Sequence, residues 1–223
     1  MVINIKICGI TTEEDACMAF NAGANSIGII IGENRSPRSV TTKMARQIMS
    51  CIPSYVTKVV VTPGNSIEEI IEIQKAINPD VIQLQEEHPL EFLEKIKEKL
   101  ADTKLIGALP LEMDSRFEDI LPKIKNMECL VDAVIFDSKA SNGRIGGSGK
   151  VHNWKLSREI RDFIYPKPSI LAGGLTPENV SRAIHIVQPW GVDVATGVEN
   201  GVVGKKSPSL VADFIKNAKN AGR

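Results

Sequence analysis

Two side chains that can exchange protons stand at the ends of apolar runs in the sequence. Cys8 closes the run Ile-Asn-Ile-Lys-Ile-Cys, and Asp137 closes the run Val-Ile-Phe-Asp. A thiolate can act as a base or a nucleophile and a carboxyl group as an acid, so the two together could move a proton between carbon and oxygen. Cys8 could instead be a small buried apolar residue, and Asp137 could cap the following loop or pair with Lys139.

Two glycine-containing segments could bind an anion. Leu-Ala-Gly-Gly-Leu-Thr-Pro-Glu-Asn-Val (171–180) and Gly-Val-Asp-Val-Ala-Thr-Gly-Val-Glu (191–199) each place glycine after an apolar run. Glycine lets backbone N–H groups approach an anion closely, and a helix that follows adds its dipole. A Gly-Gly pair alone is more often a tight turn, but two such segments in consecutive units favour a phosphate site.

Arg38, in the segment Arg-Ser-Pro-Arg (35–38), is a candidate for holding a carboxylate or a phosphate. Its guanidinium can donate two parallel hydrogen bonds to either group, although a solvated surface arginine is the commoner case. The three histidines, His88, His152 and His185, do not cluster with carboxylates at ligand spacing. We therefore expect no metal site, and we place only His152 near the candidate residues.

The elements that must position these residues alternate regularly along the chain. Short runs rich in valine and isoleucine are typical of buried parallel strands. They recur at 3–8, 25–31, 56–61, 80–84, 104–108, 132–137, 168–172 and 191–195. Segments with helical periodicity lie between them, for example 66–77 and 89–100. Predicted N-caps of the helices are Thr11 or Thr12, Thr41, Ser66, Thr176 with Pro177 just inside the helix, and Ser207.

Eight strand signals, each followed by a helix signal, predict one α/β domain over residues 1–223, a single (β/α)8 TIM barrel. An open doubly wound sheet is the structural alternative, but no G-x-G-x-x-G follows the first strand. Chemistry in such a barrel belongs at the carboxyl ends of the strands, where all the candidates above fall. The glycine-rich segment 143–149 is predicted to be a functional loop after the sixth strand.

The composition argues against several classes of partner. Lys+Arg and Asp+Glu are both 27, so the formal net charge is zero and no bulk field attracts nucleic acid or an anionic membrane. No apolar run reaches the length of a membrane span, and the N-terminus does not resemble a signal peptide. The four cysteines show no C-x-x-C pair, which favours reduced thiols over zinc or disulfides and predicts a cytoplasmic protein.

Several motifs together resemble the phosphoribosylanthranilate isomerases. Lys-Ile-Cys-Gly-Ile-Thr (6–11) is similar to the opening signature of that family, and Ser-Pro-Arg-Ser-Val (36–40) to its second motif. Gly-Gly-Ser-Gly-Lys (146–150), followed by Trp154, resembles its sixth-loop motif, and segments 171–180 and 191–199 resemble its last two. The resemblance runs in family order from residue 6 to about residue 205.

The resemblance implies an Amadori rearrangement in tryptophan biosynthesis, without cofactor or metal. N-(5′-phosphoribosyl)anthranilate would be converted to 1-(o-carboxyphenylamino)-1-deoxyribulose 5-phosphate. It implies that Asp137 protonates the ribose ring oxygen, that Cys8 removes the proton from C2′ of the Schiff base, and that Arg38 holds the anthranilate carboxylate. The implied phosphate ligands are Gly147, Gly173, Gly174, Thr196 and Gly197. For these roles we expect a lowered pKa for Cys8 and a raised pKa for Asp137.

The chain also departs from the family pattern. Gln-Leu-Gln-Glu (83–86) replaces the usual Gln-Leu-His-Gly, which puts a carboxylate, Glu86, near the mouth and leaves substrate preference open. His152-Asn153 replaces Phe-Asp. The alternatives are a related phosphosugar isomerase of histidine biosynthesis, alone or combined with the first activity, and a phosphate-binding barrel without catalysis. The sequence does not report the oligomeric state, for which a homodimer is one option.

Overall fold

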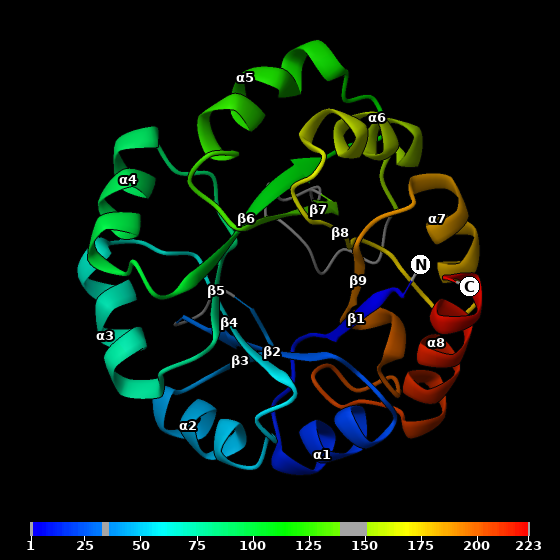
Figure 1. Cartoon of the computed structure of the whole chain (residues 1–223). Helices are drawn as coiled ribbons and strands as arrows, with labels where there is room; N and C mark the ends of the chain where they lie inside the picture. The colour runs from blue at the N-terminus through cyan, green and yellow to red at the C-terminus, as the bar shows by residue number, and fades with distance from the viewer. Residues whose placement is uncertain (1, 33–35, 139–150, 223) are drawn as a thin grey trace.

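The computed structural model describes residues 2–32, 36–138 and 151–222. Strands and helices alternate along the chain (Figure 1). The strands are β1 (Asn4–Ile7), β2 (Ser26–Ile31), β3 (Ser39–Val40), β4 (Thr57–Thr62), β5 (Val81–Leu84), β6 (Lys104–Leu111), β7 (Ala133–Ser138), β8 (Ser169–Leu171) and β9 (Gly191–Val194). The helices are α1 (Glu13–Asn21), α2 (Thr42–Ser50), α3 (Ile67–Ile77), α4 (Leu90–Lys99), α5 (Phe117–Met127), α6 (Trp154–Ile164), α7 (Val180–Val187), α8 (Pro208–Ala221) and a short 3₁₀ helix η1 (Thr196–Val198).

The strands close into a parallel barrel. Their order is β1-β9-β8-β7-β6-β5-β4-β2-β3, and a further pairing of β1 with β2 joins the two ends of the sheet. The short β3 pairs only with the carboxyl end of β2, so the barrel itself has eight strands. The helices surround it (Figure 1). The predicted (β/α)8 barrel is confirmed, and each predicted strand is present.

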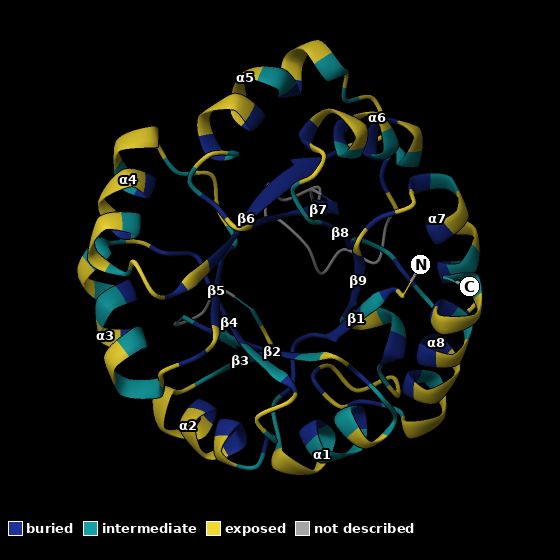
Figure 2. Ribbon diagram, viewed as in Figure 1, coloured by how far each residue is buried: buried dark blue, intermediate teal, exposed yellow. Residues whose placement is uncertain are grey.

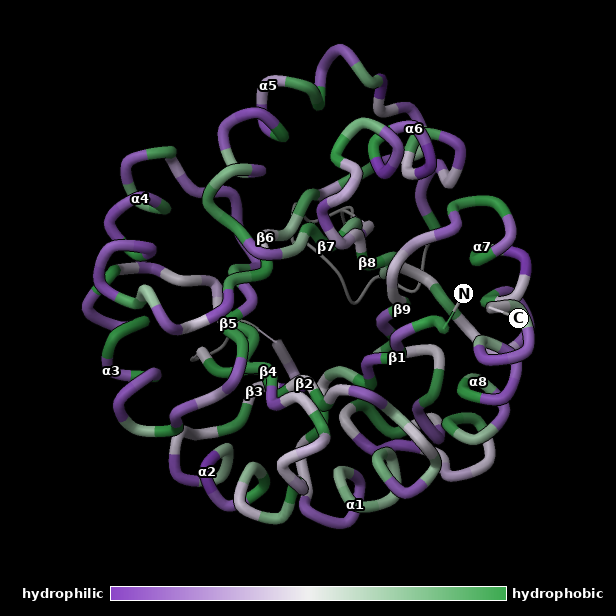
Figure 3. Tube along the Cα trace, viewed as in Figure 1, coloured by the Kyte–Doolittle hydropathy of each residue, from purple (hydrophilic) through white to green (hydrophobic). Residues whose placement is uncertain are grey.

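The eight barrel strands are buried on both faces over most of their length, which explains why they read as almost continuous apolar runs. One face of the strands packs against the helices in the larger hydrophobic cluster, for example through Ile5, Ile29 and Phe136. The alternate positions form a smaller cluster inside the barrel, which includes Cys8 and Ile135. Figure 2 shows the strands buried and the outer faces of the helices exposed, and Figure 3 shows the matching change from apolar to polar residues.

Most predicted helix starts are confirmed by side-chain caps. Thr12, Thr41, Ser66 and Ser207 each accept a hydrogen bond from a backbone N–H in the first turn of their helix.

The predicted cap at Thr176 is wrong, because α7 begins at Val180 with Asn179 before it. The side chain of Asn179 accepts a hydrogen bond from the N–H of Thr176 and donates one to the carbonyl oxygen of Gly174. This bridge holds the segment in a turn, so Pro177 lies ahead of the helix.

Candidate active site

Cys8 and Asp137 both lie at the carboxyl end of the barrel. Cys8 follows β1 directly and belongs to the cluster inside the barrel. Asp137 is near the end of β7, two residues after the interior residue Ile135, so it lies on the same face of that strand. Strands β9 and β8 separate β1 from β7 in the sheet. The two groups therefore border one barrel mouth from different strands, as the sequence predicted.

The carboxyl group of Asp137 is held by two neutral donors. The backbone N–H of Ser138 donates to Oδ1 at 2.8 Å, and Gln85 Nε2 donates to Oδ2 at 3.1 Å. Gln85 in turn accepts a hydrogen bond from Gln83 at 2.6 Å. Burial, and then the charge of Asp193, raise the pKa of Asp137 to about 6 against these hydrogen bonds. The raised pKa favours the protonated form that a general acid needs, which agrees with expectation.

The surroundings of the Cys8 thiol disfavour the ionised form that a general base needs. Its side chain is buried, and burial raises the pKa of the thiol above its ordinary value although the ammonium of Lys6 opposes this. The expected lowering of the Cys8 pKa is therefore wrong for the protein without substrate, because desolvation of a thiolate outweighs one nearby cation. Catalysis by this thiol would depend on whatever stabilises its minor ionised form.

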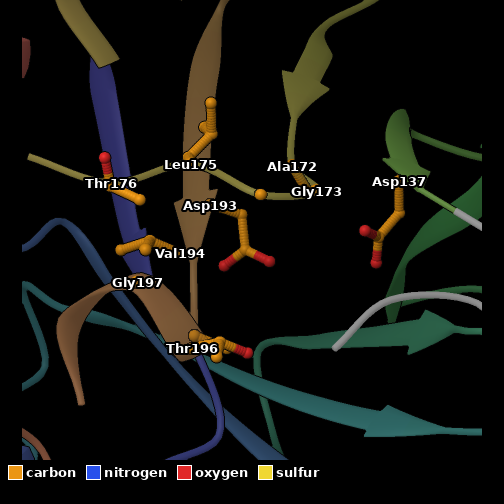
Figure 4. Close-up of a pocket in the computed structure, with 11 residues that line it drawn as sticks. Asp137, Ala172, Gly173, Leu175, Thr176, Asp193, Val194, Thr196 and Gly197 are labelled. Carbon is orange, nitrogen blue, oxygen red and sulfur yellow. The ribbon is translucent and has the colours of Figure 1, made fainter. Parts of the chain in front are cut away.

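A pocket of about 240 Å³ lies beside Asp137 at the ends of β8 and β9 (Figure 4). It is lined by Asp137, Ala172, Gly173, Gly174, Leu175, Thr176, Asp193, Val194, Ala195, Thr196 and Gly197. Four of the five residues expected to surround a phosphate are therefore together in one pocket. The fifth, Gly147, lies outside the described residues.

The backbone of this pocket is suited to an anion. Gly173 and Gly174 have φ angles of 77° and 64°, a left-handed conformation that glycine adopts without strain. No described residue accepts a hydrogen bond from the N–H groups of Gly173, Gly174, Thr196 or Gly197. A concave row of such unpaired N–H groups forms an anion-binding nest.

Gly197 makes the close approach of the two pocket loops possible. A Cβ at this position would overlap the carbonyl oxygen of Leu175 in the neighbouring loop. Because the obstacle is backbone, no side-chain rotation relieves the overlap.

Arg38 lies at the rim with its guanidinium already paired. It is buried, and it donates to both carboxylate oxygens of Glu199, at 2.6 and 2.8 Å, and to Thr196 Oγ1 at 3.2 Å. Lys206 also contacts Glu199, at 3.3 Å. Burial opposes ionisation of Glu199, but Arg38 and Lys206 more than offset it and lower its pKa. Glu199 thus bridges Lys206 and Arg38, and it holds Arg38 against the loop that carries Thr196.

The other polar candidates occupy supporting positions. His152 is buried, with its ring nitrogens 3.1 Å from Ser138 Oγ and 2.8 Å from Ser157 Oγ. It therefore lies behind Asp137 and not in the pocket, and burial lowers its pKa to about 4. Glu86 is exposed and does not line the pocket. Within the described residues, no group of three His, Cys, Asp or Glu side chains is arranged to hold a metal ion.

Known proteins match this chain over nearly its whole length. The family model described as N-(5′-phosphoribosyl)anthranilate (PRA) isomerase matches residues 5–217. The chain belongs to the N-(5′-phosphoribosyl)anthranilate isomerase family. A relative of that name from Thermotoga neapolitana is 38% identical over 219 residues, which cover 98% of this chain and 99% of the relative.

Solved phosphoribosylanthranilate isomerases have the same fold. The enzyme from Thermotoga maritima is similar with a TM-score of 0.85 and 33% identity, covering 98% of this chain and 99% of that one. A phosphoribosyl anthranilate isomerase in complex with reduced 1-(o-carboxyphenylamino)-1-deoxyribulose 5-phosphate gives 0.82 and 30% at the same coverage. A third structure, described as monomers of the dimeric isomerase from Thermotoga maritima, gives 0.81 and 30%, again at that coverage. The resemblance inferred from the motifs is confirmed.

Three polar residues of this isomerase were missed by the sequence analysis. Gln85 was noted only as a departure, yet it is the side chain that binds the Asp137 carboxyl group. Lys6 and Asp193 form a buried ion pair inside the barrel. The alternation of strand residues puts Lys6 on the same face as Cys8, but only the register of β1 and β9 reveals its partner.

Proposed function

We propose that Asp137 and Cys8 act as the acid and the base that isomerise N-(5′-phosphoribosyl)anthranilate to 1-(o-carboxyphenylamino)-1-deoxyribulose 5-phosphate, a reaction of tryptophan biosynthesis. The observation that carries this proposal is the position of an acid with a raised pKa beside an anion-binding pocket, with a thiol at the same barrel mouth. A phosphate in the pocket would fix one end of the substrate, and the sugar carbons would lie between the two groups.

The first step is ring opening by Asp137. Its proton passes to the ribose ring oxygen, the C1′–O bond breaks, and the anthranilate nitrogen supplies the electron pair that forms a protonated Schiff base. Asp137 is left as a carboxylate, which the Ser138 N–H and the Gln85 amide stabilise through the hydrogen bonds that they already make.

The second step is proton removal by Cys8. The thiolate takes the proton from C2′, and the electrons of that C–H bond form the C1′–C2′ double bond and neutralise the Schiff base nitrogen. The resulting enol becomes the ketone of the product when C1′ takes the proton from the Cys8 thiol and the 2′-hydroxyl group gives its proton to the Asp137 carboxylate, which restores both groups. The sequence of steps leaves the total number of protons unchanged, as an isomerisation requires.

The remaining contacts would orient the substrate. The free N–H groups of Gly173, Gly174, Thr196 and Gly197 would hold the phosphate. Gly147, which lies outside the described residues, is the fifth ligand of the proposal. Arg38 would hold the anthranilate carboxylate through guanidinium donors that Glu199 leaves free, since the group has five N–H donors. The pairing with Glu199 would keep the guanidinium in place before the substrate arrives.

Gly197→Ala is expected to weaken phosphate binding at least tenfold. The added methyl group pushes the two pocket loops apart, and a displacement of about 1 Å in a positioning contact can reduce activity on the order of 10²-fold. Calorimetric titration with inorganic phosphate and the KM for substrate both report the change. Gly222→Ala is the control, because Gly222 follows α8 with a φ of −81°, which alanine adopts without strain, and does not line the pocket. An unchanged phosphate affinity in Gly197→Ala would contradict the proposed cradle.

Turnover of freshly generated phosphoribosylanthranilate, followed by the loss of anthranilate-type fluorescence, tests the proposed reaction. We expect turnover of this compound and none of the aminoimidazole ribotide substrate of the histidine-pathway isomerase. Inorganic phosphate binding serves as the control for an intact pocket. Phosphate binding without turnover would overturn the proposed reaction in favour of a barrel that only binds phosphate.

We also propose that the enzyme is a homodimer that associates through the amino-terminal face of the barrel. The solved isomerase described as dimeric supports this, and so do large exposed apolar side chains that precede the strands. They are Val2, Tyr55, Tyr165 and Trp190. Large apolar side chains exposed at the end of the barrel opposite the active site are typical of a protein interface.

Trp190→Glu is expected to convert the dimer to a monomer, because a charge would be buried in the interface. Light scattering coupled to size-exclusion chromatography measures the mass. Met113→Glu is the matched control, since Met113 is also exposed but follows β6 at the opposite face of the barrel. A monomeric wild type would contradict the proposal.

A cytoplasmic location also remains a proposal, supported by the cysteine pattern of the sequence. No helix in the described part of the chain combines the length and the apolar character that a membrane crossing requires.

A further inference from the structure

The Lys6–Asp193 ion pair is an unusual feature of the barrel interior. Lys6 in β1 and Asp193 in β9 are partners in the strand register, and Lys6 Nζ lies 3.0 Å from Asp193 Oδ1. Their side chains are only 4% and 9% exposed, and the interior cluster next to them is apolar. Burying two charges there has a desolvation cost that an apolar pair would avoid, so stability alone does not account for the pair.

The ammonium end of the pair is next to Cys8. Lys6 and Cys8 are two residues apart and share the inner face of the barrel wall. The sulfur of Cys8 lies 2.8 Å, and Lys6 Nζ 3.0 Å, from the point where Gly28 of β2 would carry a Cβ. The thiol and the ammonium thus both border the small gap that is left because Gly28 has no side chain.

The carboxylate end of the pair faces the other catalytic candidate. Asp193 and Asp137 line the same pocket, and Figure 4 shows both carboxyl groups directed into it from β9 and β7. Two carboxylates that share a pocket disfavour each other's ionisation. The carboxyl group of Asp193 contacts the ammonium of Lys6, whereas that of Asp137 accepts from the neutral amide of Gln85. Asp137 is therefore the group that keeps its proton.

We propose that the Lys6–Asp193 ion pair is a positioning device for both catalytic groups, with its ammonium stabilising the Cys8 thiolate and its carboxylate keeping Asp137 protonated. The proposal rests on the acid and base roles given above. Both charges act in the direction that catalysis requires, because the base must be ionised and the acid must not be. The buried pair thus favours the one protonation state of the site that can react.

The pKa directions agree with this geometry. After burial, the largest influence on the Cys8 pKa is Lys6, which lowers it, while Asp193 raises it and Lys206 lowers it less. After burial, the largest influence on the Asp137 pKa is Asp193, which raises it, while Lys6 lowers it less. Burial works against the Lys6 ammonium, but Asp193 and Cys8 keep its pKa above the ordinary value. Removing both charges therefore moves the two catalytic pKa values apart.

The double variant Lys6→Met with Asp193→Asn tests the proposal without leaving one buried charge unpaired. A nearby opposite charge typically changes the acid dissociation constant of a group about 10- to 1000-fold. The losses of Lys6 and Asp193 partly cancel in the double variant, so we expect the dissociation constants of Cys8 and Asp137 each to change about tenfold. We expect the acidic limb of the pH–rate profile to move down and the alkaline limb to move up. The plateau between them then falls about 100-fold, because only the thiolate form with a protonated Asp137 reacts.

Alkylation of Cys8 by iodoacetamide gives a readout that does not depend on the reaction. Mass spectrometry of the Cys8 peptide measures the rate at each pH, and we expect its midpoint to lie about one pH unit higher in the double variant. Lys6→Arg, which keeps the charge, should retain the wild-type midpoint. The pair Lys97→Met with Asp132→Asn, also 3.0 Å apart but partly exposed, is the control and should change neither measurement.

The outcomes separate the two proposals. An unchanged Cys8 midpoint in the double variant would overturn the role of the ion pair even if the enzyme isomerises its substrate. A raised midpoint in a protein without isomerase activity would support the ion pair and overturn the proposed reaction. A loss of activity in which neither limb nor midpoint moves would mean that the pair is merely structural, and it would also overturn the inference.

Discussion

Replacing Cys8 by alanine is expected to lower kcat for phosphoribosylanthranilate by about 10²- to 10⁴-fold, the usual contribution of a general base. The thiol is the proton acceptor that we assign to C2′, and the methyl group of alanine cannot accept a proton. Steady-state fluorescence kinetics measure kcat and KM. We expect KM to change little, because the phosphate pocket lies on β8 and β9.

The control for this variant is Cys129→Ala, whose thiol is exposed and outside the site. It should retain wild-type kinetics. Circular dichroism of Cys8→Ala should match the wild type, since the lost sulfur is a small part of the interior cluster. A Cys8→Ala enzyme with more than about a tenth of wild-type kcat would show that another group is the base.

Asp137→Asn is expected to abolish most of the activity and yet to stabilise the protein at neutral pH. Burial raises the pKa of Asp137 from its ordinary value of 3.8 to about 6, so the unfolded carboxyl group ionises more readily than the folded one. Stability is therefore lost as the pH rises from about 4 to 6, and the full loss, about 3 kcal/mol, is present above that range. Asparagine cannot ionise and avoids this loss.

The net gain in unfolding free energy should be about 2 kcal/mol at pH 8. Gln85 Nε2 donates a hydrogen bond to Asp137 Oδ2 in the wild type. In the variant the NH2 group of the asparagine side chain takes the place of that oxygen, so the hydrogen bond is lost at a cost of about 1 kcal/mol. Urea denaturation at pH 8 and pH 4 measures the difference. At pH 4 the carboxyl group of the folded wild type is protonated, so the gain falls below the cost of the lost hydrogen bond and the variant should be no more stable than the wild type. Asp119→Asn, at an exposed carboxylate, is the control and should show little change at either pH.

A variant that is inactive but no more stable at pH 8 than the wild type would contradict the raised pKa of Asp137. The expected combination of lower activity and higher stability follows from the function of an acid that must stay protonated in a buried site. Asp193 contributes to the same loss of stability, so the acid site and its supporting ion pair form one unfavourable electrostatic arrangement that catalysis uses.

The sequence alone determined the architecture and the end of the barrel that carries the chemistry. Parallel strands buried on both faces produce local apolar runs, and helix caps such as Thr12 and Ser66 act within one turn, so neither depends on distant residues. The alternation of strands and helices then implies the barrel, and the rule that active sites lie at the carboxyl ends of its strands selects Cys8 and Asp137.

Only the tertiary structure decided the direction in which the pKa values of these groups are shifted. Lys6 and Asp193 are 187 positions apart, and Arg38 and Glu199 are 161 apart, so their pairing exists only once the last strand closes on the first. The rise in the Cys8 pKa was predicted with the wrong sign, because burial depends on the whole surrounding barrel and outweighs the lysine two residues away. Local patterns identify the chemical groups, whereas the free energy of ionising them is set by neighbours that barrel closure brings together.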